Sequence, residues 1–156
     1  MGEFDIILKS LFAVITERVN YLEEMSKEFP NFSSFKKANH RYISAIERDL
    51  QVAIEACIDI GKVIISEKKL RPPESMKDIC TILFENGFID DRMLSVLDRM
   101  VGTRNILVHR YEKIDLEIIY GILKRHLQDF KRFIKQISKK TFTQGKRLKV
   151  KSQKSP

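Results

Sequence analysis

Residues that make turns are scarce in this sequence, which has 6 glycines and 4 prolines among its 156 residues. A β-sandwich or β-barrel needs a turn signal about every ten residues, so this scarcity excludes both. Long hydrophobic runs are missing as well, because the longest apolar stretch, residues 52–65, is interrupted by Glu55, Asp59 and Lys62. That stretch cannot span a membrane. The opening residues, MGEFDIILKS, lack the basic start of a signal peptide, so we expect a cytoplasmic protein.

Cysteine is equally rare, and the two that occur, Cys57 and Cys80, have no Cys or His neighbour at the spacing of a metal site. Both lie in apolar runs, where a thiol packs as a small hydrophobic group. The sequence also lacks a glycine-rich phosphate loop and any cluster of His and Cys residues. We therefore expect two buried free thiols in a reducing compartment, no metal site and no cofactor.

Acidic residues are absent from the C-terminal segment, and this absence explains why the net charge of the chain is +8. Residues 130–156 hold ten Lys or Arg and no Asp or Glu, whereas residues 1–129 are slightly acidic overall. The last stretch, TFTQGKRLKVKSQKSP, has little apolar content and no period. We predict a helical domain over residues 1–139 and a flexible basic tail over residues 140–156. The tail either solubilises the protein or attracts RNA or another polyanion regardless of sequence.

Hydrophobic residues at helical spacing occur almost throughout the chain. A candidate N-cap, Ser75, precedes one apolar segment, Asp90 or Asp91 precedes the next, and Asp115 precedes the last. The stripes predict helices over residues 3–28, 38–67 and 75–86, a fourth beginning near residue 90, and a fifth running from residue 115 to about residue 137. With short connections between them, these elements predict an all-α protein, an up-and-down bundle of four main helices plus one short helix.

One segment, RMVGTRNILVHRYE at residues 99–112, contains polar and charged side chains that helix packing alone does not explain. It gathers five polar residues around an apolar trio: Arg104, Asn105, His109, Arg110 and Tyr111. A histidine can move a proton near neutral pH, and a guanidinium grips phosphate oxygens with two hydrogen bonds. His109 as general acid or base and Arg104 as stabiliser of transition-state charge suit metal-free cleavage of a phosphodiester. The alternative is that these side chains only satisfy carbonyl groups at a helix C-terminus.

The spacing of these two residues constrains how they could meet. Arg104 and His109 are five residues apart, which is about 140° around an ideal helix. They therefore converge only through a bend, a helix end or a second copy of the chain, and a symmetric dimer would supply the second copy. Asp59, close to the apolar face of the second predicted helix, either orients a motif residue or has a structural role.

The string RNILVHRY, residues 104–111, resembles the R-x4-H-x-Y motif of the HepT-like branch of the HEPN superfamily. The string RYISAIERDLQVAIEACIDIGKVII, residues 41–65, is similar to the second helix of that family. The resemblance covers about residues 5–137 and leaves out the basic tail. It implies a dimeric all-α bundle in which the motifs of both protomers line a shared cleft.

The resemblance also implies a function: a metal-independent endoribonuclease, the toxin of a type VII-like toxin–antitoxin pair. Its partner would be a minimal nucleotidyltransferase of the MntA type, which transfers AMP to the motif tyrosine. Carried over, Arg104 and His109 are catalytic, Asn105 is supporting and Tyr111 is the modification target. Arg110 adds positive charge to the substrate cleft.

Two other functions stay open. The chain could be a helical dimer that binds a nucleotidyltransferase without cutting RNA, or a purely structural interaction protein. The presence of both Arg104 and His109 favours the nuclease.

Overall fold

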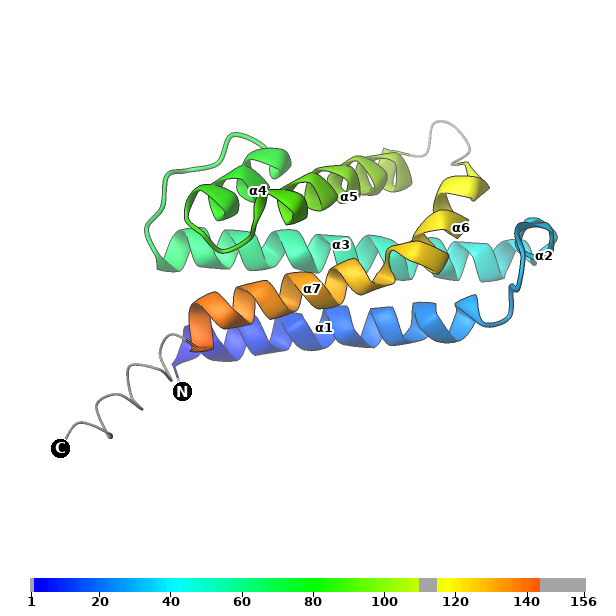
Figure 1. The fold of residues 1–156 in the computed structure, drawn as a ribbon, viewed down its shortest axis with the longest axis horizontal. Coiled ribbons are helices and arrows are strands. Elements are labelled where there is room, and N and C mark those ends of the chain that lie inside the picture. The colour runs from blue at the N-terminus through cyan, green and yellow to red at the C-terminus, as the bar shows by residue number, and fades with distance from the viewer. Residues whose placement is uncertain (1, 110–114, 144–156) are drawn as a thin grey trace.

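The computed structural model describes residues 2–109 and 115–143, and every regular element in these ranges is helical (Figure 1). The predicted all-α class is confirmed. The elements are α1 (Glu3–Ser26), α2 (Phe32–Lys36), α3 (His40–Glu67), α4 (Met76–Glu85), α5 (Asp91–His109), α6 (Leu116–Arg125), α7 (Leu127–Ser138) and a π-helical turn, η1 (Lys139–Thr143).

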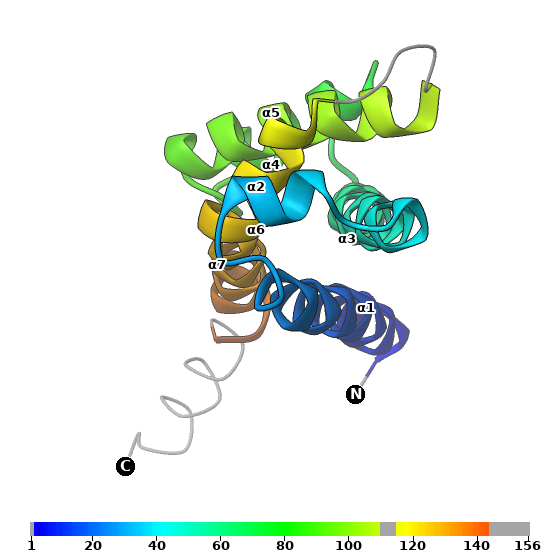
Figure 2. The ribbon, with the colours of Figure 1, turned by 90° about the vertical axis from the view of Figure 1, so that its right-hand side faces the viewer.

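The four long helices alternate in direction along the chain, as the predicted up-and-down bundle requires (Figure 1). α3 is central, because α1 packs on one side of it and α4 and α5 pack on another. Viewed from the end, α1, α3 and α7 are seen nearly along their axes, and α4 and α5 lie across the top of α3 (Figure 2). In the described residues no helix is long and apolar enough to cross a membrane.

The predicted apolar stripes form one core. Side chains from α1, α3 and α7 are almost completely buried there, among them Leu8, Ile15, Leu22, Ile46, Ile60, Ile64, Phe130 and Phe133. Each such side chain contributes about 1.5–3 kcal/mol by leaving water. Cys57 and Cys80 are buried and free, as predicted. Burial raises the pKa of the Cys57 thiol, and raises that of Cys80 to about 12, so neither is a thiolate at neutral pH.

Polar side chains begin the helices where the sequence indicated. The Oγ of Ser75 accepts a hydrogen bond from the Asp78 amide at 3.0 Å, and Oδ1 of Asp90 accepts one from the Met93 amide at 2.8 Å. Asp115 caps α6 in the same way, at 2.8 Å from the Glu117 amide. These three predicted caps are confirmed, and each stabilises its helix by about 1 kcal/mol.

Two local features were not predicted. Residues 31–34 lie between the helices predicted over 3–28 and 38–67, but they begin a further helix, α2: Oδ1 of Asn31 accepts from the Ser34 amide at 2.9 Å and the Ser34 Oγ accepts from the Asn31 amide at 3.4 Å. This reciprocal pair lets one short turn bury Phe35.

The fifth predicted helix is also two helices, because the chain breaks at His126 between α6 and α7. α6 is tied to the end of α1, where Lys124 Nζ donates to the Ser26 carbonyl at 2.6 Å and the Tyr120 hydroxyl donates to the Phe29 carbonyl at 3.1 Å. α7 instead packs lengthwise on α1. The apolar period continues across the break, so the sequence pattern gave no sign of it.

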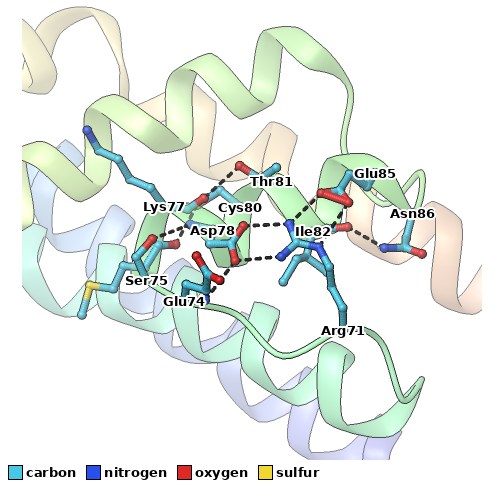
Figure 3. A network of polar contacts seen from close by, with 11 residues as sticks. Arg71, Glu74, Ser75, Lys77, Asp78, Cys80, Thr81, Ile82, Glu85 and Asn86 are labelled. Carbon is cyan, nitrogen blue, oxygen red and sulfur yellow. Dashed lines mark hydrogen bonds and ion pairs between the residues drawn. The ribbon is translucent and has the colours of Figure 1, made fainter.

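The connection between α3 and α4 is fixed by one arginine (Figure 3). The guanidinium of Arg71 donates two hydrogen bonds to Asp78, at 2.7 and 2.9 Å, and two to Glu85, at 2.7 and 3.3 Å. α4 in turn lies so close to α3 that a Cβ at Gly61 would overlap the side chain of Ile79. This packing sets where α5 begins its path across α3.

Candidate active site

Arg104 points from α5 toward α3 and is paired there with a carboxylate. Its Nη2 and Nε lie 3.0 and 3.3 Å from the same oxygen, Oε2, of Glu55. The other oxygen, Oε1, accepts a hydrogen bond from Gln51 Nε2 at 3.3 Å. The Arg104 side chain is 18% exposed and that of Glu55 is 34% exposed, so the pair is partly shielded from water. The two long helices are therefore joined at the start of the RNILVHRY segment.

Asn105 supports the same guanidinium, because its Oδ1 accepts a hydrogen bond from Nη1 of Arg104 at 3.2 Å. The contacts with Glu55 and Asn105 engage three of the five N–H groups of the guanidinium. The remaining two have no partner among the described residues. Two N–H groups are what a bidentate contact with a phosphate needs.

A hollow of about 290 Å³ lies beside this pair. Its polar lining consists of Arg104, Glu55, Asp59 and Lys62, from α3 and α5. Asp59 is one turn further along α3 than Glu55, is 53% exposed, and lies 3.9 Å from the ammonium group of Lys62. The structure therefore brings Asp59 to the same hollow as Arg104, with its charge turned toward Lys62.

His109 is the last residue of α5 and is exposed. Since α5 is continuous from Asp91 to His109, no bend within it brings His109 toward Arg104. Their positions differ by about 140° around the helix and about 7.5 Å along it. Of the three ways in which the two side chains could converge, the helix end and a second copy of the chain remain.

The three apolar residues between Arg104 and His109 differ in their exposure to solvent. Leu107 is buried, whereas Ile106 and Val108 are 49% and 39% exposed. Both exposed side chains lie within the RNILVHRY segment, where they are accessible for an apolar contact with another protein. Arg110 and Tyr111 lie outside the described residues, so their predicted roles stay predictions.

Glu55 and Gln51 were not among the predicted site residues. In the sequence, Glu55 is notable only as one of the charged residues that interrupt the apolar stretch 52–65. A signal was present, because Gln51, Glu55 and Asp59 follow one another at intervals of four residues and so share one face of α3. What the sequence could not show is that this face meets Arg104. In residues 2–109 and 115–143, no three His, Cys, Asp or Glu side chains converge as a metal site would require.

Comparison with known proteins gives one family. A family model described as HepT-like, ribonuclease HepT-like, matches residues 15–137. The mRNA nuclease HepT of Shewanella oneidensis is 33% identical over 130 residues, which are 83% of this chain and 94% of that protein.

Solved structures agree with this match. The tri-AMPylated Shewanella oneidensis HEPN toxin in complex with MNT antitoxin has a chain that is 31% identical, with a TM-score of 0.78 over 88% of this chain and 98% of that one. A chain of the crystal structure of a toxin–antitoxin with AMP-PNP is also 31% identical, with a TM-score of 0.77 over 85% of this chain and 97% of that one.

Proposed function

This chain belongs to the HepT-like family of ribonucleases, and we propose that it is the toxin of a type VII-like toxin–antitoxin pair. In this proposal it is an endoribonuclease that cuts RNA without a metal. The observation that carries the proposal is the arrangement of Arg104, which is held by Glu55 and Asn105 and has two N–H groups without a partner in residues 2–109 and 115–143. His109 lies on the same helix.

The residues divide the chemistry between them. The 2′-hydroxyl of RNA attacks the neighbouring phosphorus, and the bond from phosphorus to the 5′-oxygen breaks, leaving a 2′,3′-cyclic phosphate and a 5′-hydroxyl. His109 either takes the proton of the attacking hydroxyl or gives one to the leaving oxygen, and water carries out the other of these two proton transfers. Arg104 stabilises the charge that builds up on the phosphorane-like transition state. Asn105 and Asp59 support the site, and Arg110 binds substrate phosphate.

A homodimer completes the site. On one continuous helix Arg104 and His109 face different directions, so the Arg104 of one protomer would act with the His109 of its partner. The exposed Ile106 and Val108 support a protein contact at this place.

The partner antitoxin is a minimal nucleotidyltransferase that silences the enzyme by transferring AMP to Tyr111. The similarity to an AMPylated HEPN toxin in complex with MNT antitoxin supports this part of the proposal. Tyr111 is two residues from His109, so an attached AMP would put bulk and a negative charge where substrate phosphate binds.

The test is an RNA cleavage assay in EDTA that compares the wild type with His109→Ala. We expect the wild type to cleave, and His109→Ala to lower the rate by at least about 100-fold, because general acid–base catalysis is worth that much or more. His40→Ala, which removes another exposed histidine at a helix end, is the matched control and should keep full activity.

Circular dichroism shows whether each variant is folded. If the wild type is folded and free of AMP by mass spectrometry and yet cuts no RNA, the nuclease proposal is wrong. The chain would then be a helical module that binds a nucleotidyltransferase.

A further inference from the structure

We infer that Glu55 is a positioning residue for RNA cleavage, which acts by holding the guanidinium of Arg104 in one orientation. The inference rests on the proposed nuclease activity. An arginine side chain has many rotamers, and fixing one has an entropic cost. The ion pair with Glu55 already fixes the rotamer of Arg104 in the free protein, so this entropy is not lost when RNA binds.

The contacts of Glu55 hold its carboxylate in place. Its two oxygens have separate partners, with Oε2 on Arg104 and Oε1 on Gln51. The nearby carboxylate of Asp59, by contrast, is more exposed than that of Glu55 and lies 3.9 Å from a surface lysine. Glu55 is therefore the carboxylate that can determine where Arg104 points.

The pair also determines which part of the guanidinium is open. Glu55 uses the Nε group and one N–H of Nη2, and Asn105 uses one N–H of Nη1. Within the described part of the chain, one N–H on each terminal nitrogen has no partner and is open to substrate. These two donors can bind two oxygens of one phosphate together, which is the contact that stabilises a phosphorane-like transition state.

Charge gives the inference a sharp test, because two explanations predict opposite results. A carboxylate close to the phosphate site repels RNA, so on charge alone its removal would strengthen binding and would not slow cleavage. If Glu55 positions Arg104, its removal slows cleavage even though RNA binds at least as tightly. A displacement of about 1 Å in a catalytic group can cost about 100-fold in rate.

The experiment compares the wild type with Glu55→Gln and Glu55→Ala. Glu55→Gln keeps the shape of the side chain and one acceptor oxygen, so it remains informative if Glu55→Ala fails to fold. The single-turnover cleavage rate is measured at saturating oligoribonucleotide, and the affinity is measured with the all-deoxy version of that oligonucleotide, which cannot be cut. We expect the rate to fall about 10- to 100-fold in Glu55→Ala and less in Glu55→Gln, with no loss of affinity.

The matched control is Glu23→Gln. The Glu23 side chain is also 34% exposed, and it also forms an ion pair between two helices, with Lys131 at 2.6 Å. Because that pair joins α1 to α7, its loss should leave the cleavage rate unchanged. An unchanged or higher rate in Glu55→Gln and Glu55→Ala, or a fall in affinity that matches the fall in rate, would overturn the inference.

A further variant, Arg104→Ala, separates this inference from the proposed function. If the wild type cleaves, Arg104→Ala does not, and the Glu55 variants behave as the wild type, only the positioning role is wrong. If the folded wild type does not cleave, the proposed function is wrong and the role of Glu55 in cleavage falls with it.

Discussion

Arg104 is held from two sides, by a carboxylate on another helix and by the amide next to it in the chain. The contact with Glu55 joins residues that are 49 positions apart, whereas the contact with Asn105 joins neighbours. The local contact follows from the sequence, because adjacent side chains are always within reach. The distant contact depends on how α3 and α5 pack, and it is the one that orients the guanidinium.

Tyr111 is the residue at which we expect regulation to act. Tyr111→Phe removes the phenolic oxygen that would accept AMP, and it leaves Arg104 and His109 unchanged. We expect the variant to cut RNA at close to the wild-type rate, and to stay active when the nucleotidyltransferase and ATP are added. Mass spectrometry should detect AMP on the wild type and none on the variant.

Tyr42→Phe is the matched control, because Tyr42 is in α3, outside the RNILVHRY segment, and burial raises its pKa to about 12. This control should be modified and silenced as the wild type is. A Tyr111→Phe protein that still gains AMP and loses activity would show that another residue accepts the group.

At the scale of the elements, the ion pairs of the connection between α3 and α4 make the stability of the protein depend on pH. Hydrogen bonds from Arg71 lower the pKa of Asp78 and of Glu85 below their ordinary values. Since these pKa values are lower in the folded state than in the unfolded state, the stabilisation is complete above about pH 5 and is lost as the pH falls through the folded-state values.

Arg71→Ala should therefore lower the melting temperature at pH 7, and the difference from the wild type should shrink toward about pH 3. Thermal unfolding followed by circular dichroism across this range measures both. Arg92→Ala, which removes an exposed arginine from α5, should show a smaller difference that does not follow the same pH dependence. A difference for Arg71→Ala that is constant with pH would contradict the role of the two carboxylates.

On the scale of the whole molecule, the proposed dimer predicts that two inactive variants can restore activity to each other when they are mixed. Arg104→Ala and His109→Ala are each expected to be inactive. In a mixed dimer, one site would combine an intact Arg104 from one protomer with an intact His109 from the other. If each site takes its two residues from different protomers, unfolding and refolding an equal mixture should recover about a quarter of wild-type activity.

Neither variant refolded by itself should recover activity, and light scattering should give the mass of a dimer for both. A mixture that stays inactive while mixed dimers are present, as tagged copies and native mass spectrometry would show, would mean that each protomer uses its own Arg104 and His109.

The sequence by itself determined the helical class, the apolar stripes, the capping residues such as Ser75, the buried thiols and the position of the motif. Each depends on neighbours within about one or two helical turns, where the period of 3.6 residues fixes which side chains share a face. It did not determine the break at His126 or the pairing of Glu55 with Arg104. Both depend on how whole helices pack. The contact of α6 with the end of α1, and the contact of α3 with α5, exist only in the assembled bundle.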